Sequence, residues 1–437
     1  MSISAPRCFS PEFMAADSGG VRVRGFEKVR EARESSCLFA GDWASIRLHA
    51  GMAARDPAEV YGAALFERIR SADFAAVNLE SALGGDEPLL KDGPCLQGPP
   101  ESAAALKGAG FDLATLANNH IFDYGVEGLR ATLETCKAAG LAVCGAGMDL
   151  AEAMRPEVVE FDGWKLGVLS LCDLEEGAAD WDRPGTALIH HPQMRDFVRA
   201  AREAVDALVL VVHGGREYVP VPPPYWRDAV LAAGREADLV VGHHPHVPQG
   251  MTLLERADGV RVPVVFSTGN FLFRPADPAP GWIPPRTADG YVVEAGFTAG
   301  ALSRLDLVPY RIEQERGPRL LEESEAFQHF LEATSAALVD RSSVADWFDA
   351  VADHFWAVQV RERVGGLTAK ACEGEREAIR HALSHHLSPA HSTLIHRAME
   401  RELHQTAGTG PGKIREQLRG WFDGSWPELG DGFSLQT

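Results

Sequence analysis

Three histidines within four positions, His243, His244 and His246, are the densest group of potential metal ligands in this sequence. They follow the mostly apolar run 237–241, which reads as a buried parallel strand that delivers side chains at its carboxyl end. In an extended backbone, His244 and His246 would point to one side of the strand and His243 to the other. We therefore interpret the stretch as part of a metal site, with a histidine-rich surface loop as the alternative.

Four other apolar runs, 37–40, 74–77, 113–117 and 207–212, also end in residues that can bind a metal or transfer protons. In chain order these residues are Asp42, Asn78, Glu80, Asn119, His120, Asp123 and His213. Each one alone has an ordinary explanation, such as a turn carboxylate for Asp42 or a structural histidine for His213. Together they offer carboxylate, amide and imidazole groups, which suit Mn²⁺, Fe²⁺ or Zn²⁺ better than an all-oxygen site for Mg²⁺ or Ca²⁺.

The elements that carry these residues alternate between strands and helices, which predicts an α/β fold with a mixed sheet. Helices are expected over 56–72, 101–110, 126–140 and from the prolines at 222–224 to Gly234. Further strands are expected at 141–145, 262–268, 290–295 and 302–308, with a hairpin over 158–172 that turns at Asp162-Gly163.

Three regions differ in character along the chain. Residues 1–35 read as a leader or peripheral segment, residues 36–315 as the α/β domain, and residues 316–437 as a charged, helical C-terminal extension. The histidines of the extension, among them His381 and His385, are interpreted as lying on solvated helices. The glycine patterns at 145–147 and 408–413 lack residues that a nucleotide-binding loop needs, so we reject both.

Composition narrows the range of partners and locations. The net charge of -20, without a cluster of basic residues, argues against nucleic acid. Seven scattered cysteines without a Cys-x-x-Cys pair argue against a disulfide framework and favour a reducing compartment. We find neither a signal peptide nor an apolar run long enough to span a membrane, so we expect a soluble, cytoplasmic protein.

Six blocks of the sequence, in order, resemble the CapA family of poly-γ-glutamate capsule biosynthesis proteins, which are related to the calcineurin-like metallophosphoesterases. The blocks contain Asp42 with Arg47, Asn78 with Glu80, Asn119 with His120 and Asp123, His213 with Glu217, His243 with His244 and His246, and Asn270. The resemblance covers about residues 36–310 and implies a four-layer α/β/β/α sandwich with two divalent metal ions (Mn, Fe or Zn) at the strand ends.

The resemblance also implies roles for individual residues. It implies metal ligands at Asp42, Glu80, Asn119, His213, His244 and His246, with His120 in the place of the catalytic histidine. We add Asp123 and His243 as catalytic candidates. Substrate contacts are expected from Arg47, Asn78, Glu217 and Asn270.

The sequence departs from the family pattern at two places. Trp43-Ala44 follows Asp42 where the phosphoesterases have an Asp-x-His motif, so we expect the first metal to be held differently. Gly214-Gly215 stands where the family usually has Trp-Gly, which we expect to open room beside His213.

These observations favour a metal-dependent hydrolase or transferase acting on a phosphoester or on an amide of a glutamate-like substrate. The expected partner is a small or peptide-like anionic molecule, with self-association into a homo-oligomer left open. The alternatives are a non-catalytic protein that binds a polyglutamyl chain and a protein that assists a ligase in a biosynthetic pathway.

Overall fold

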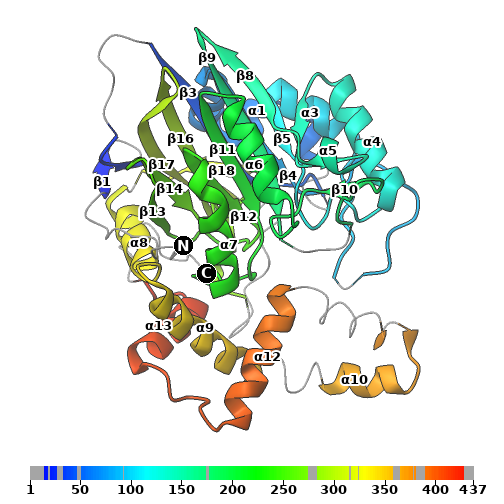
Figure 1. Ribbon diagram of the computed structural model, residues 1–437, viewed down its shortest axis with the longest axis vertical. Coiled ribbons are helices and arrows are strands. Elements are labelled where there is room, and N and C mark those ends of the chain that lie inside the picture. The colour runs from blue at the N-terminus through cyan, green and yellow to red at the C-terminus, as the bar shows by residue number, and fades with distance from the viewer. Residues whose placement is uncertain are drawn as a thin grey trace.

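Two β-sheets that lie face to face form the centre of the molecule, as the computed structural model shows (Figure 1). The structure describes residues 14–17, 20–26, 33–46, 51–91, 93–173, 177–273, 283–313, 316–322, 324–357, 365–376, 378–379 and 389–427.

The first sheet is built on four parallel strands, followed on one side by antiparallel ones. The parallel strands are β3 (Glu34–Trp43), β4 (Phe74–Leu79), β5 (Leu113–Thr115) and β6 (Ala142–Cys144). The antiparallel hairpin of β16 (Asp289–Thr298) and β17 (Ala301–Glu313) pairs with the other edge of β3. Beyond it lie β1 (Met14–Asp17), β2 (Gly20–Val23) and β18 (Gly317–Leu320), while β15 (Asn270–Leu272) pairs with the end of β3.

The second sheet also has a parallel centre, formed by β9 (Trp164–Cys172), β11 (Ala207–His213), β12 (Leu239–His243) and β14 (Arg261–Val265). Antiparallel strands flank it, β8 (Glu157–Phe161) on one side and β13 (Met251–Glu255) on the other. The predicted hairpin over 158–172 is confirmed, because β8 and β9 pair across Asp162-Gly163. Two short strands, β7 (Ala146–Gly147) and β10 (Gly185–Thr186), pair separately.

Helices cover the outer face of each sheet. On the first sheet lie α1 (Pro57–Tyr61), α2 (Ala63–Ser71), α3 (Glu101–Ala109) and α4 (Gly125–Ala138), and on the second lie α6 (Met194–Glu203) and α7 (Pro224–Ala233). Apolar side chains of both sheets, such as Phe39 and Leu210, share the core between them. This confirms the α/β/β/α order that the resemblance implied, with α5 (Leu150–Ala153) as a short connecting helix.

One prediction about an individual element is corrected. The single helix expected over 56–72 is wrong, because Gly62 has a φ of 70° and separates α1 from α2. A positive φ is incompatible with a continuous right-handed helix, and glycine adopts it without a steric penalty. Helix α6 and strand β13 were not predicted at all.

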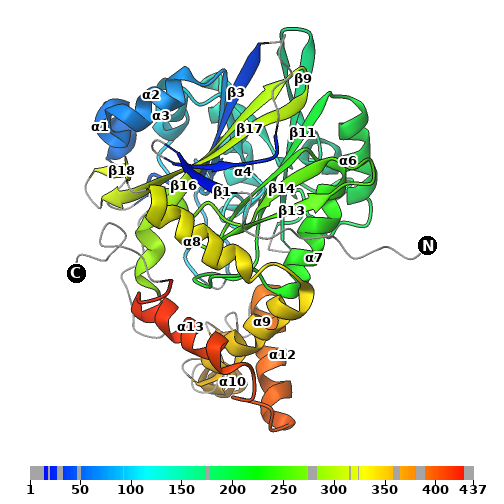
Figure 2. The same cartoon turned by 90° about the vertical axis from the view of Figure 1, so that its left-hand side faces the viewer.

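Past β18 the described residues form helices: α8 (Ser324–Ala336), α9 (Arg341–Phe355), α10 (Gly365–Cys372), α12 (Pro389–Leu403) and α13 (Gly412–Asp423). Figure 2 shows α8 crossing one side of the molecule, where it contacts β1 and β2 of the first sheet and β13 of the second. Helix α9 contacts α7, α12 and α13. His381 and His385 lie outside the described residues.

Among the described residues, we find no helix that combines the length and the apolar character needed to cross a membrane.

Candidate metal centre

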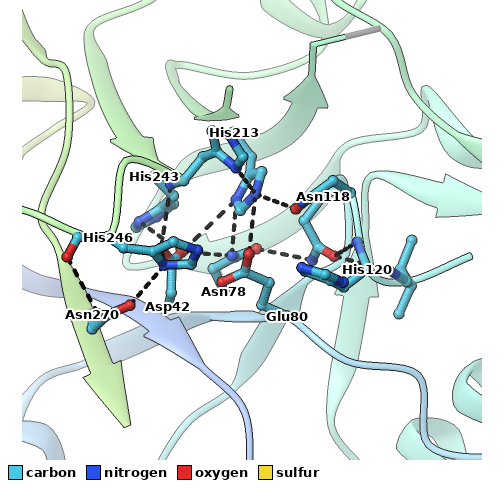
Figure 3. Close-up of polar contacts among 12 residues, drawn as sticks. Asp42, Asn78, Glu80, Asn118, His120, His213, His243, His246 and Asn270 are labelled. Atoms are coloured by element: carbon cyan, nitrogen blue, oxygen red, sulfur yellow. Dashed lines mark hydrogen bonds and ion pairs between the residues drawn. The ribbon is translucent and has the colours of Figure 1, made fainter. Parts of the chain in front are cut away.

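The carboxyl ends of the parallel strands of both sheets meet at one place, where the predicted site residues gather (Figure 3). Asp42 lies at its centre and is completely buried. Its Oδ1 accepts a hydrogen bond of 2.8 Å from the amide of Asn78, and its Oδ2 accepts one of 3.2 Å from the backbone N–H of His244. The first contact lies within one sheet and the second joins the two sheets.

Close backbone packing explains the glycine before Asp42. A Cβ atom at Gly41 would lie 2.2 Å from the carbonyl oxygen of Gly269, so no larger residue fits. The register between β3 and β4 shifts between Ala40 and Asp42, which marks a bulge at this point. Bulges are common next to functional sites, where they redirect a side chain.

Two groups of three side chains have the spacing of metal ligands, and both contain Glu80. One group is Glu80, His213 and His244, and the other is Asp42, Glu80 and His246, with ligand atoms within 4.8 Å of one another in each group. All five residues are buried. A shared carboxylate between two such groups is the arrangement expected for two neighbouring cations.

The carboxylate of Glu80 is buried without the hydrogen bonds that would replace its hydration. Both of its oxygen atoms are buried and accept no hydrogen bond from any described residue. Burial therefore raises the pKa of Glu80. Burial and the neighbouring Glu80 also raise the pKa of Asp42, to about 6. Divalent cations would neutralise both groups, so the residues present fit a metal centre.

The imidazoles of the first group are held in the form that binds metals. Burial lowers the pKa of His213 and of His244 well below the usual value, so both rings are neutral at pH 7. Nε2 of His213 lies 2.9 Å from Oδ1 of Asn119 and 3.2 Å from Nδ1 of His244. Asn119 therefore lies beside the same group, and its role as a metal ligand stays a prediction.

His246 is in a different electrostatic environment. Burial lowers its pKa, but the carboxylates of Glu80, Glu217 and Asp42 outweigh burial and raise its pKa above the usual value. Nδ1 of His246 lies 2.9 Å from Oδ1 of Asn270 and 3.8 Å from Oδ2 of Asp42.

The prediction that His243 points away from the other two histidines is wrong. Strand β12 ends at His243, and the backbone is then left-handed at His244 and His246, with φ values of 100° and 56°. The alternation of an extended strand does not continue through these residues. Nδ1 of His243 lies 3.7 Å from Oδ1 of Asp42 and 3.0 Å from Oγ1 of Thr268, so all three rings border the site.

His120 forms a second part of the site, together with a residue that was not predicted. Its Nδ1 lies 2.7 Å from Oδ2 of Asp123, whose Oδ1 is ion-paired with Lys91. Lys91 is buried and donates a 2.9 Å hydrogen bond to the carbonyl oxygen of Asn119. Burial alone would raise the pKa of Asp123, but His120 and Lys91 outweigh it and lower that pKa. Lys91 lies in the loop 84–100, where no motif marked it.

The expected space beside His213 is filled. A Cβ atom at Gly214 would lie 2.6 Å from Cβ of Asp173 and 2.8 Å from the ring of Trp226, so the glycine admits these two side chains. The prediction of an open space there is therefore wrong, because it did not include a tryptophan from α7.

The predicted substrate-binding residues differ in their placement. Asn78 and Asn270 are buried and hydrogen-bonded to Asp42 and to His246, respectively. Burial alone would raise the pKa of Glu217, but nearby positive charge, that of His246 and Arg216 in particular, outweighs burial and lowers this pKa. Arg47 lies outside the described residues. Contact with substrate stays a prediction for all four.

The fold and the site together define an α/β protein with a candidate metal centre between two sheets. Residues 36–275 match the model of a family described as bacterial capsule synthesis protein PGA_cap. The chain belongs to this family, which confirms the resemblance noted from the six sequence blocks.

Curated relatives have names in keeping with that family. The chain is 31% identical over 228 residues to the capsule biosynthesis protein CapA of Bacillus anthracis, covering 50% of this chain and 52% of that protein. It is 31% identical to the PGA biosynthesis protein CapA of Bacillus subtilis, covering 50% and 56%. A probable polyglutamine synthesis accessory protein of Mycobacterium tuberculosis is 29% identical, with 40% and 50% covered. The chain thus spans about half the length of the curated relatives it matches.

Among solved structures, a novel phosphatase from Mycoplasma pneumoniae overlaps 64% of this chain and 94% of its own, with 14% identity and a TM-score of 0.41. This likeness is too remote to assign a function.

Proposed function

We propose that the protein is a metal-dependent enzyme that holds two divalent cations on either side of Glu80 and acts on an anionic substrate. The observation that carries the proposal is the carboxylate of Glu80, which is buried, lacks hydrogen bonds from the described residues and belongs to both ligand groups. A buried carboxylate without partners costs stability, unless a cation compensates it.

The two ligand groups have different compositions. Glu80, His213 and His244, with Asn119 beside them, offer one carboxylate and two imidazoles, while Asp42, Glu80 and His246 offer two carboxylates and one imidazole. Mixed nitrogen and oxygen ligands suit Mn²⁺, Fe²⁺ or Zn²⁺. When bound, such cations act as Lewis acids.

The chain's own acid–base group is His120. Asp123 orients the ring through Nδ1, so that Nε2 is the nitrogen left for proton transfer. Lys91 fixes Asp123 from the other side and so makes the orientation of His120 more rigid. We assign His120 as proton donor or acceptor, and Asp123 and Lys91 as residues that position it.

The substrate class is proposed from the cations of the site and from the names of the relatives. The protein carries a net charge of -20, so an anionic molecule would be drawn to the site by the cations rather than by the surface. The names of the relatives support a glutamate-type or peptide-like substrate in capsule or polyglutamate synthesis, and a phosphoester is the other candidate. The predicted cytoplasmic location and homo-oligomer stay predictions.

One finding favours a second candidate function, which is a binding role without turnover. Two mycobacterial relatives are named as probable accessory proteins, so the family model alone does not establish catalysis. In this case the cations would hold an anionic chain for another enzyme.

Metal analysis combined with turnover separates these functions. We expect about two Mn²⁺ ions per chain, and hydrolysis of an aryl phosphate or of a γ-glutamyl anilide that falls in a His120→Gln variant with its metal retained. Metal without turnover of either probe would favour the binding role. A protein that takes up no Mn²⁺, Fe²⁺ or Zn²⁺ would contradict the proposal.

A further inference from the structure

Two separate segments of the α/β domain support His246, and the same tryptophan of the C-terminal extension contacts both. The first segment is the loop 214–218, and the second is the turn η5 (Pro285–Ala288). The tryptophan is Trp421 in α13, which is completely buried.

The first support runs through Tyr218. Its backbone N–H donates a 2.9 Å hydrogen bond to the carbonyl oxygen of Pro245, the residue before His246. The rings of Tyr218 and His246 are 6.0 Å apart. Tyr218 has a φ of 64°, a conformation that is unfavourable for a residue with a large side chain and persists only where its surroundings hold it.

Trp421 is one of the groups that hold Tyr218 in this conformation. The indole Nε1–H of Trp421 donates a 2.9 Å hydrogen bond to the carbonyl oxygen of Tyr218. The neighbouring Arg216 is held by the extension as well, because its guanidinium lies 5.0 Å from the ring centre of Phe355 in α9. The C-terminal extension therefore contacts the loop at two residues, Arg216 and Tyr218.

The second support runs through Asn270. Its Oδ1 lies 2.9 Å from Nδ1 of His246, and its amide donates a 2.9 Å hydrogen bond to the carbonyl oxygen of Thr287 in η5. The amide group is thus oriented by η5. Arg286, the residue before Thr287, is buried, and its guanidinium lies 5.7 Å from the ring centre of Trp421.

We propose that Trp421 is a positioning residue for the Asp42–Glu80–His246 ligand group, acting on His246 through Tyr218 and through Arg286. This inference rests on the proposed metal centre. It assigns to the C-terminal extension a role in metal binding, although none of its described residues belongs to either ligand group. Groups that orient a metal ligand typically change metal affinity by about 10- to 100-fold when they are replaced.

The Glu80–His213–His244 group is the internal reference. His213 contacts Asn78, Asn119 and His244, whereas the indole N–H of Trp421 donates to the carbonyl oxygen of Tyr218. Loss of the Trp421 contacts should therefore weaken one cation and spare the other, whereas general loosening of the fold would weaken both.

The test is a titration of the full-length protein with Mn²⁺, followed by calorimetry. Trp421→Phe keeps an aromatic ring but removes the N–H donor, and we expect one of the two binding events to weaken by about tenfold. Trp347→Phe is the matched control, because Trp347 is also buried and packs 5.1 Å from Trp426 in the same cluster. The control should leave both events unchanged.

Double variants show which of the two ligand groups has lost Mn²⁺ affinity. In His244→Ala only the Asp42–Glu80–His246 group is intact, and adding Trp421→Phe should weaken the remaining event. In His246→Ala the same addition should have no effect. Arg286→Lys loses the flat guanidinium over the indole and should weaken the same Mn²⁺-binding event as Trp421→Phe. It replaces Trp421→Phe in the test if that variant does not fold.

Three results would overturn the inference. Unchanged affinities in both Trp421→Phe and Arg286→Lys would show that the contacts do not matter. Equal weakening of both events, matched by Trp347→Phe, would show a structural role only. Failure of the wild-type protein to bind Mn²⁺ would contradict the proposed function itself, and this result is distinct from the other two.

Discussion

Nε2 of His213 lies 3.5 Å from Oε1 of Glu80, although the two residues come from different sheets. Glu80 follows β4 of the first sheet and His213 ends β11 of the second. Each ligand group combines residues of both sheets in the same way. The candidate metal centre therefore depends on the packing of the two sheets against each other.

Replacement of Glu80 tests the shared ligand. We expect Glu80→Gln to abolish binding of both cations, because the amide offers one weak donor in place of a bridging carboxylate. In the metal-free protein the variant should be more stable by on the order of 1 kcal/mol, since a buried carboxylate without hydrogen bonds is replaced by a neutral group. Elemental analysis and urea unfolding measure the two effects.

Glu294→Gln is the control for this variant. Glu294 lies on β16 of the same sheet and is paired with Arg68 at 3.0 Å. This variant should keep both cations, and a Glu80→Gln protein that did the same would be incompatible with a bridging role.

The pKa of Asp42 predicts how pH affects stability. It is raised from 3.8 to about 6 by burial and by Glu80, so the folded, metal-free protein binds this proton more tightly than the unfolded chain does. The contribution of this group to stability is therefore present at low pH and is lost as pH rises from about 4 to about 6.

Cations reverse this trend, because they bind the ionised carboxylates. We expect Mn²⁺ to raise the melting temperature more at about pH 7 than at about pH 5. Thermal unfolding with and without Mn²⁺ at both pH values checks this. An equal rise of the melting temperature at both pH values would indicate that Asp42 is not a ligand.

Gly242 is expected to be irreplaceable for steric reasons. A Cβ atom there would lie 2.1 Å from the carbonyl oxygen of Phe266, so Gly242→Ala must separate β12 from the residues after β14. We expect a loss of about 1–3 kcal/mol in the free energy of unfolding and weaker Mn²⁺ binding, because His243 and His244 follow directly. Gly51→Ala is the control, because no atom lies within 4 Å of a Cβ at that position, and it should change neither quantity. If Gly51→Ala lowered both quantities as well, the effect of Gly242→Ala would not be specific to this site.

His120 should affect turnover without affecting metal content. We expect His120→Gln to lower turnover by about 100-fold, the usual contribution of a general acid or base. His190→Gln is the control, because His190 also faces a carboxylate, Asp173 at 3.2 Å, outside both ligand groups. Equal activity of the His120 variant and the wild type would refute the assignment.

Much of the site was predictable because its chemistry is local in sequence. Asp42, Glu80, His120 and His213 each follow an apolar run, and parallel strands bring their carboxyl ends to one edge. The alternation of elements predicted an α/β fold with a mixed sheet, and the resemblance implied two sheets with helices outside, an arrangement that the structure confirms.

The errors concern features that depend on the backbone or on distant residues. The orientation of His243 was wrong because the backbone turns left-handed at His244, which strand periodicity does not reveal. Lys91 and Trp421 could not be found, because each acts through contacts with residues far away in the chain. The space beside Gly214 was misjudged for the same reason, since Trp226 fills it.

The most direct test of the central claim is the anomalous scattering of crystals grown with Mn²⁺. Two peaks, one on each side of the Glu80 carboxylate, are predicted, with Asp42 and His246 next to one and His213 and His244 next to the other. Crystals without a peak beside Glu80, or with Mn²⁺ bound only elsewhere, would contradict the account.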